Sequence, residues 1–167
     1  MKNKPIVSVV MGSDSDLEIM REAGKALDTF GIAYEMDITS AHRSPARTSE
    51  YARQAAGRGI RVIIAGAGGA AHLAGVIAAE TTLPVIGVPI PSSSLQGMDS
   101  LLAIVQMPAG IPVATVAIGK AGATNAGILA AQMLALADNE IAKKLIAYKQ
   151  KLAQGVEEKS NKLREGK

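Results

Sequence analysis

Residues 5–18 read PIVSVVMGSDSDLE, and the order of side chains in this stretch indicates the first strand and helix of the chain. Residues 5–11 are apolar and rich in β-branched side chains, which predicts a short buried strand that Gly12 closes. Ser15 and Glu18 stand three positions apart, the spacing of a capping box, so we expect a helix to begin there. A strand, a polar loop and a helix therefore follow one another directly at the N-terminus.

The same alternation continues along the chain. We expect further strands over residues 33–38, 61–65, 84–88 and 112–118, and helices over residues 15–30, 45–58, 73–81, 98–106, 122–137 and 138–154. Short apolar strands that alternate with helices indicate a parallel sheet with both faces covered. The predicted fold class is α/β: a three-layer, doubly wound parallel sheet of flavodoxin-like size, with an extra C-terminal helix.

Charge is distributed unevenly along the sequence. The formal net charge of +3 arises entirely within residues 138–167, whereas residues 62–137 hold only Glu80, Asp99 and Lys120 as charged side chains. Prolines interrupt the long apolar stretches of the charge-poor segment, so we expect no membrane-spanning helix. The basic side chains near the C-terminus alternate with Ala, Ile and Leu, which indicates a solvated helix face rather than a nucleic-acid site. We expect a cytoplasmic protein, in keeping with the absence of cysteine.

The sequence also predicts how the chain is organised. Residues 1–137 are expected to form a single α/β domain, and residues 138–167 an amphipathic helix and a charged tail that frays beyond Gly155. An exposed surface as large and as poor in charge as the central segment is unusual on a monomer. We therefore expect an obligate homo-oligomer in which the Ala/Gly-rich helix of residues 121–137 forms interface and the helix of residues 138–154 packs on a neighbouring subunit.

The first polar loop is residues 12–16, GSDSD, between the first strand and the first helix. Glycine permits a tight turn, the hydroxyls of Ser13 and Ser15 can donate, and a helix N-terminus offers unpaired N–H groups, a combination that suits a phosphate. Asp14 and Asp16 disfavour an anion beside them unless they reach a sugar hydroxyl instead. The alternative interpretation is a turn and an N-cap with no ligand.

The second polar loop is residues 40–45, SAHRSP, after the second strand. Arg43 can bind a phosphate through two parallel hydrogen bonds, and His42 can exchange a proton near neutral pH. Ser44 and Pro45 are typical of the N-cap and first residue of a helix, which would fix the loop. A surface His–Arg pair without function remains the alternative.

The third loop is residues 66–72, GAGGAAH. It is similar to a dinucleotide-binding fingerprint, but it follows the third strand and no acidic residue ends the next strand to bind a ribose. Its small residues would instead let the backbone approach a flat ligand closely, with His72 as a binding or capping residue. With two histidines and no cysteine in the chain, we expect no metal site.

Together these segments resemble the PurE family, the N5-carboxyaminoimidazole ribonucleotide mutases of bacterial purine synthesis. The resemblance covers nearly the whole chain, from about residue 7 to residue 134. Its matching stretches are VMGSDSD (10–16), SAHRSP (40–45), VIIAGAGGAAHLAG (62–75), LPVIGVP (83–89) and residues 98–134.

The resemblance implies a homo-octamer and a reaction that moves a carboxylate from the exocyclic N5 of a phosphorylated imidazole ribonucleotide to ring carbon C4. It implies no cofactor, metal or ATP. By the matching motifs His42 is the catalytic acid–base, and the positions expected to bind substrate are Ser13, Ser15, Asp16, Ser40, Ala41, Arg43, Gly68, Gly69, His72 and Leu73.

Three other functions stay open at this point. A carboxylase would join free CO2 to aminoimidazole ribonucleotide on the same fold. A non-catalytic nucleotide-binding module would bind ligand without turnover, but it gives no reason for His42 to stand beside Arg43. A nicotinamide or flavin enzyme is disfavoured by the missing acidic residue and by the shortage of aromatic side chains near the loops.

Overall fold

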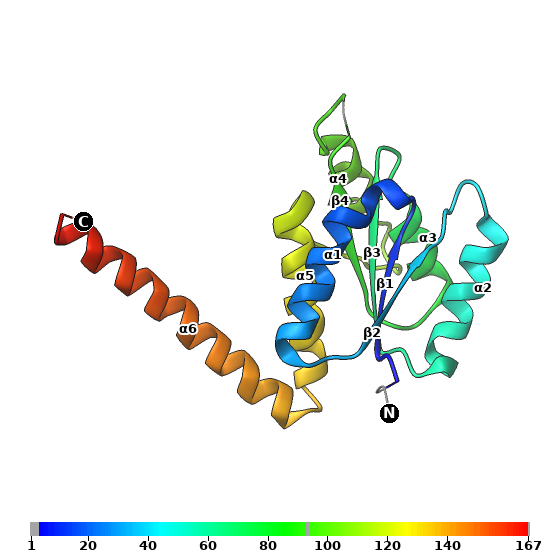
Figure 1. Cartoon of the computed structure of the whole chain (residues 1–167). Coiled ribbons are helices and arrows are strands. Elements are labelled where there is room, and N and C mark those ends of the chain that lie inside the picture. The colour runs from blue at the N-terminus through cyan, green and yellow to red at the C-terminus, as the bar shows by residue number, and fades with distance from the viewer. Residues whose placement is uncertain (1–3, 93, 167) are drawn as a thin grey trace.

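The computed structural model describes residues 4–92 and 94–166 of the chain. Its centre is a five-stranded sheet in the order β2-β1-β3-β4-β5, and every pairing in it is parallel (Figure 1). The strands are β1 (Val7–Met11), β2 (Tyr34–Ile38), β3 (Val62–Gly68), β4 (Val85–Ile90) and β5 (Ala114–Thr115). The predicted doubly wound parallel sheet is confirmed.

Helices cover both faces of this sheet. They are α1 (Leu17–Phe30), α2 (Pro45–Ala55), α3 (Leu73–Glu80), α4 (Met98–Val105), α5 (Gly119–Ala135) and α6 (Asn139–Arg164), with short 3-10 turns η1 (Asp14–Asp16) and η2 (Ala56–Arg58). Helices α1 and α5 contribute to a core on one face, whereas α2, α3 and α4 contribute to a separate core on the other. Figure 1 shows the two layers on either side of the strands.

Alternation of side chains along β1 and β3 feeds both cores. Val9 and Ile64 belong to the core under α1 and α5, and their neighbours Val10 and Ile63 belong to the core on the opposite face. All four side chains are fully buried. The continuous apolar runs of the sequence therefore reflect strands buried on both faces, as parallel sheets require.

The start of the first helix differs from the prediction. Ser15 and Glu18 do not form a capping box, because a 3-10 turn precedes α1 and Ser13 is its N-cap, accepting from the backbone N–H of Ser15. Glu18 lies on the exposed surface and pairs with Lys120 of α5. Ser15 and Glu18 have the spacing of a capping box, but the Glu18 carboxylate forms an ion pair with Lys120 instead.

The segment between α4 and α5 was also predicted incorrectly. The strand expected over residues 112–118 is only β5, in which Ala114 and Thr115 are the residues paired with β4. The helix expected from residue 122 already begins at Gly119, whose φ of +75° suits glycine. The periodicity of the sequence does not show how many residues of an apolar run pair with a neighbouring strand.

The C-terminal helix α6 is longer than predicted. Asp138 caps it as expected, accepting from the backbone N–H groups of Glu140 and Ile141. The prediction of a frayed tail beyond residue 155 is wrong, since the helix continues to Arg164. Good helix formers are frequent around the single Gly155, among them Ala153, Gln154, Glu157 and Glu158, and their preference outweighs its cost of about 1 kcal/mol.

The first part of α6 contacts the domain. Ile141 is buried, Lys144 Nζ donates to the carbonyl oxygen of Phe30 at 2.7 Å, and the rings of Phe30 and Tyr148 meet edge to face at 5.5 Å. Beyond these contacts the helix runs away from the domain (Figure 1). Within the described residues, no helix is both long and apolar enough to cross a membrane.

Candidate functional site

A cavity of about 330 Å³ opens at the carboxyl ends of the strands. The chain leaves β1 toward β2 on one side of the sheet and leaves β3 toward β4 on the other, so the loops after β1 and β3 diverge. In doubly wound sheets ligands bind in the crevice that this divergence creates. Every candidate residue of the sequence analysis except His72 lines this cavity: Ser13, Ser15, Asp16, Ser40, Ala41, His42, Arg43, Gly68, Gly69 and Leu73.

The loop after β1 is fixed by its own hydrogen bonds. Gly12 N–H donates to the carbonyl oxygen of Gly66 at 3.2 Å, which ties the loop to β3. The Ser13 hydroxyl donates to Asp14 at 3.0 Å, and the Ser15 hydroxyl donates to Asp16 at 3.3 Å. The loop therefore presents hydroxyl and carboxylate groups that already bond one another and can exchange partners when a ligand arrives.

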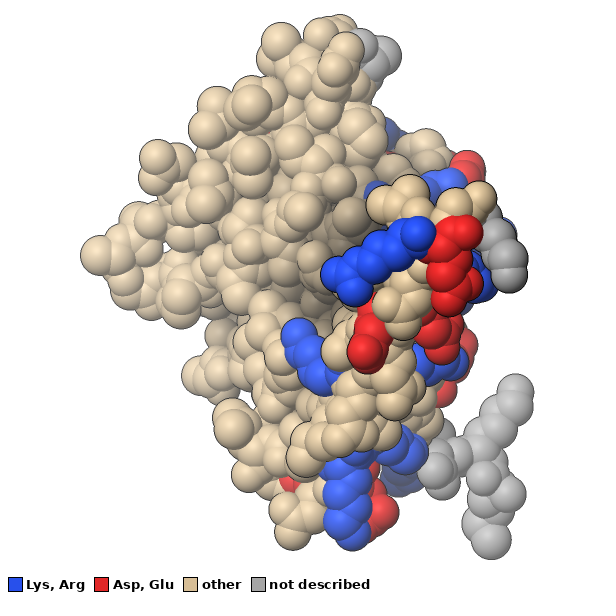
Figure 2. All heavy atoms as spheres, turned by 90° about the vertical axis from the view of Figure 1, so that its left-hand side faces the viewer, with Lys and Arg blue, Asp and Glu red and all other residues tan. Residues whose placement is uncertain are grey.

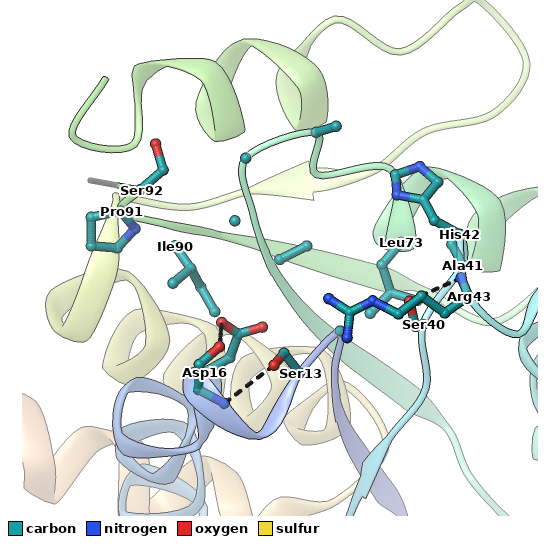
Figure 3. Close-up of a pocket in the computed structure, with 16 residues that line it drawn as sticks. Ser13, Asp16, Ser40, Ala41, His42, Arg43, Leu73, Ile90, Pro91 and Ser92 are labelled. Carbon is teal, nitrogen blue, oxygen red and sulfur yellow. Dashed lines mark hydrogen bonds between the residues drawn. The ribbon is translucent and has the colours of Figure 1, made fainter. Parts of the chain in front are cut away.

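Asp16 is the buried carboxylate of this loop, with 8% of its surface exposed. Burial raises the pKa of its carboxyl group above the ordinary value, and the hydrogen bond from Ser15 offsets this only in part. Figure 3 shows the carboxylate directed into the cavity, opposite Arg43. A carboxylate held in this way costs stability and can serve as an acceptor for ligand hydroxyl groups.

The loop after β2 carries His42 and Arg43. Its base is fixed where Thr39 N–H donates to the Met11 carbonyl oxygen at 2.9 Å, and its turn is closed by Ser44 N–H, which donates to the Ser40 carbonyl oxygen at 2.9 Å. Arg43 N–H also donates to the Ser40 hydroxyl at 3.2 Å. The Arg43 side chain reaches across the opening toward Ser13 and Asp16 (Figure 3).

The third loop begins later than expected, because β3 extends to Gly68 and not only to residue 65. A Cβ built on Gly68 would lie 3.3 Å from the carbonyl oxygen of Ile90, so a side chain there would press on β4. Gly69 follows with a φ of +60°, a conformation that favours glycine, and the space beside it is open. The loop therefore forms a wall of backbone and small side chains.

His72 lies outside the cavity lining and contacts His42 instead. The Nε2 atom of His42 and the Nδ1 atom of His72 are 2.9 Å apart, and the two rings are perpendicular. His72 is the N-cap residue of α3, but its side chain makes no capping hydrogen bond. In this structure the His72 side chain therefore meets the proposed acid–base residue, and its contact with substrate stays a prediction.

Sequence reasoning missed one wall of the cavity. Ile90, Pro91 and Ser92, at the end of β4, line it opposite His42 and Arg43 (Figure 3). They follow a predicted strand, so their position at the carboxyl edge was the available signal. Gly12, Ala67 and Ala70 also line the cavity; they belong to the predicted loops but were not among the expected substrate-binding positions.

No metal cluster is evident in the part of the chain that the structure describes. Residues 4–92 and 94–166 contain no group of three or more His, Cys, Asp or Glu side chains that could hold a metal ion. Arg43 supplies the cationic side chain of the cavity lining and Asp16 supplies the carboxylate. The chemistry available from this lining is anion binding, hydroxyl binding and proton exchange.

Comparison with known proteins gives the family. A family model described as AIR carboxylase matches residues 6–155. The chain belongs to the AIR carboxylase family. Among relatives of this family, the N5-carboxyaminoimidazole ribonucleotide mutase of Pyrococcus horikoshii is 58% identical over 162 residues, which are 97% of this chain and 90% of that protein. The protein of the same name from Bacillus subtilis is 57% identical over 96% of this chain and 99% of its own length.

A solved structure supports the assignment to the AIR carboxylase family. The crystal structure of Treponema denticola PurE matches with a TM-score of 0.87 at 32% identity, over 95% of this chain and 98% of that chain. The resemblance to the PurE family that the sequence motifs indicated is therefore confirmed, and so is the flavodoxin-like architecture.

Proposed function

We propose that this chain is a mutase that converts N5-carboxyaminoimidazole ribonucleotide into 4-carboxy-5-aminoimidazole ribonucleotide in de novo purine synthesis. Relatives at 55–60% identity carry the name of this mutase. The observation that carries the proposal is the convergence of His42, Arg43 and Asp16 on one cavity. A proton-exchanging group, an anion-binding group and a hydroxyl-binding group thereby surround a space of the size that small ligands use.

Substrate binding follows from the charges around the cavity. Arg43 binds the 5′-phosphate, because its planar guanidinium can donate two parallel hydrogen bonds to phosphate oxygens. The hydroxyls of Ser13 and Ser15, which bond carboxylates in the free protein, turn to the ligand. Asp16 accepts from the ribose hydroxyls, which keeps its negative charge away from the phosphate.

The reaction needs one group that first gives and then takes a proton. Protonated His42 delivers a proton to N5 as the N5–carboxylate bond breaks and CO2 leaves. Carbon C4 of the resulting aminoimidazole then attacks CO2 and forms the new carbon–carbon bond. Neutral His42 removes the C4 hydrogen as a proton, which restores the aromatic ring and returns the histidine to its starting state.

The walls of the cavity retain the CO2 between the two bond changes. Backbone and small side chains of the loop after β3 form one wall, and Leu73 and Ile90, both buried, add apolar surface. With substrate bound across the opening, these walls hold CO2 close to C4 and exclude water that would hydrate it. No cofactor, metal or ATP takes part in this scheme.

The experiment that tests the mutase uses substrate labelled with 13C in its N5 carboxylate. In buffer kept free of bicarbonate, the wild-type protein should form the C4-carboxylated product with the label retained. A product that forms only from aminoimidazole ribonucleotide and added bicarbonate would contradict the proposal. Binding of the nucleotide without any turnover would contradict it as well.

The second candidate function is a carboxylase that uses free CO2. The name of the matching family model, AIR carboxylase, favours keeping it. It uses the same fold, phosphate-binding arginine and acid–base histidine, so the static geometry serves both reactions. Dilution of the 13C label by unlabelled bicarbonate distinguishes them, because a carboxylase exchanges its CO2 with the solution whereas a mutase retains it.

We further propose that the chain assembles with copies of itself, as an octamer by its resemblance to the PurE family, and that it acts in the cytoplasm. Exposed apolar side chains follow one side of α4, with Met98 and Leu102 each 53% exposed. The outer part of α6 exposes Leu152 and Val156. In Figure 2 a broad area on the left of the view holds no charged side chains. Such surfaces are typical of subunit interfaces.

The mass of the protein in solution tests this assembly. Light scattering coupled to gel filtration should give a mass several times that of the 17.2 kDa chain over the working range of concentration. An active, monodisperse monomer would contradict it. We also propose that the α/β domain ends at residue 137. The segment of residues 138–167, which contains α6, should then pack on a neighbouring subunit in the assembly.

A further inference from the structure

The two histidines of the chain form a pair at the edge of the cavity, which His42 lines and His72 does not. Residue 42 follows β2 and residue 72 precedes α3, yet His42 Nε2 and His72 Nδ1 lie 2.9 Å apart. The ring centroids are 4.9 Å apart and the rings are perpendicular. This is hydrogen-bond geometry between one ring N–H and one ring lone pair.

Proton stoichiometry restricts which histidine donates. A neutral imidazole carries hydrogen on one nitrogen, whereas an imidazolium carries hydrogen on both. When His42 is protonated, its Nε2 is a donor, so the bond survives only if His72 Nδ1 is the acceptor. His72 is then neutral with its hydrogen on Nε2.

We propose that His72 is a positioning residue that holds His42 in a single tautomer, so that Nδ1 of His42 is the atom that exchanges the proton with substrate. This inference rests on the proposed mutase function. The hydrogen on His42 Nε2 stays bonded to His72 throughout the cycle. One proton leaves Nδ1 for N5 of the substrate, and one proton returns to Nδ1 from C4, so protons balance over the reaction.

The value of this arrangement lies in the neutral intermediate state. After it has protonated N5, a free imidazole would interconvert between two tautomers, only one of which presents a lone pair to C4. With Nε2–H bonded to His72, the lone pair remains on Nδ1. A carboxylate plays the corresponding part in a Ser-His-Asp triad, where the wrong tautomer costs about 10⁴-fold in kcat. A neutral acceptor fixes the tautomer without adding a negative charge beside the substrate carboxylate.

A structural role explains the pair poorly. Both histidine side chains are exposed, so their contact buries little surface. The loop that carries His42 is closed by the bonds of Ser44 N–H and Arg43 N–H to Ser40. The backbone of His72 starts α3 by accepting from Val76 N–H at 2.9 Å, without help from its side chain. Loss of the His72 imidazole should therefore leave stability unchanged.

Two substitutions separate the acceptor from the rest of the side chain. His72→Leu removes it, and His72→Asn retains a carbonyl oxygen close to the place of Nδ1. We expect His72→Leu to lower kcat at least tenfold with KM changed less than threefold and the same melting temperature. We expect His72→Asn to recover most of that loss. Equal kcat for wild type and His72→Leu would overturn the proposal, as would equal losses in both variants.

Nitrogen NMR gives a readout that does not depend on turnover. Because the chain has only two histidines, 15N-imidazole labelling gives two ring systems, and the His72 variants assign them. In the neutral state His42 should carry its hydrogen on Nε2 in wild type, and His72→Leu should show a mixture of tautomers. A hydrogen on Nδ1 of neutral His42 in wild type would overturn the inference. Failure of the mutase function would instead appear as absent turnover in wild type, with these NMR results intact.

Discussion

A Cβ atom built on Gly127 of α5 would lie 2.6 Å from the carbonyl oxygen of Ala23 in α1. The two helices that cover one face of the sheet therefore approach each other backbone to backbone here, at a distance that only glycine allows. Because the atom in the way belongs to the main chain, it cannot rotate aside.

Gly127→Ala should lower the free energy of unfolding by about 1–3 kcal/mol, as overpacking does in closely packed cores. Chemical denaturation monitored by circular dichroism measures it. The matched control is Gly57→Ala, since a Cβ there meets no atom within 4 Å and φ is not in the left-handed region. That control should raise stability by about 0.4–1 kcal/mol, and an equal loss in both variants would refute the explanation.

Asp16→Asn should increase the stability of the folded protein at neutral pH and decrease its affinity for nucleotide. Burial raises the pKa of Asp16, so between the unfolded and folded pKa values the native state binds more protons than the unfolded state. The contribution of this carboxyl to stability therefore falls as pH rises through that window. Asp16→Asn should be more stable than wild type at neutral pH and lose that advantage below pH 4, while its affinity for nucleotide decreases. A variant that is less stable at neutral pH would contradict the assignment of burial as the cause.

Arg43→Lys should raise KM about tenfold and leave kcat within about twofold. Lysine keeps the charge but loses the fork that binds phosphate through two hydrogen bonds, and a hydrogen bond to a charged group contributes about 1.5–3 kcal/mol. Arg47→Lys is the control, because Arg47 pairs with Asp37 at 2.9 Å and does not line the cavity. Steady-state kinetics with the mononucleotide, compared with a substrate that lacks the phosphate, checks the result; equal effects on both substrates would rule out the phosphate contact.

His42→Asn should lower kcat by a factor of at least about 10²–10⁴, the usual contribution of a general acid–base group. Product affinity should change less than threefold, because Arg43 and Asp16 retain their contacts. Rapid-quench turnover and calorimetric titration of the product measure the two quantities. Turnover within tenfold of wild type would exclude His42 as the acid–base residue.

Val156→Glu on the outer part of α6 should shift the protein to smaller assemblies. Val156 is 69% exposed in the single chain, and a charge there would be costly if a neighbouring subunit covers it. Lys162→Gln changes the net charge by the same amount on the same helix and serves as control. Native mass spectrometry that finds the same assembly for both variants would place the interface elsewhere.

The sequence predicted the sheet, its class and the edge at which the cavity lies, because these depend on local patterns. Amino-acid composition alone distinguishes the apolar runs that form β1 and β3. It also distinguishes the polar loops of residues 12–16 and 40–45. The length of β5 and the extent of α6 were predicted less well, since they depend on what each segment meets in space. The spacing of apolar residues along the chain does not predict which strands pair or which distant segments come into contact.

The site shows the same division. The motif residues line one cavity together, except His72. Ile90, Pro91 and Ser92 were not predicted, because apolar and small residues at the end of a strand carry no signal that separates them from residues of the core. The hydrogen bond between His42 and His72 joins two loops that lie apart in the sequence, and the residue pattern of neither loop predicts this contact. Its prediction requires the register that β1 imposes on its two neighbours.

The brevity of β5 also bears on how the protein avoids aggregation. With two residues, the outermost strand beside β4 offers almost no free ladder of N–H and C=O groups to a strand from another chain. Edge-to-edge growth of the sheet is therefore discouraged on that side. A protein with a large uncharged surface can thus associate with further copies through its helices without forming fibrils. The backbone N–H and C=O groups of a helix are already hydrogen-bonded within it, so they are not available to pair with a strand.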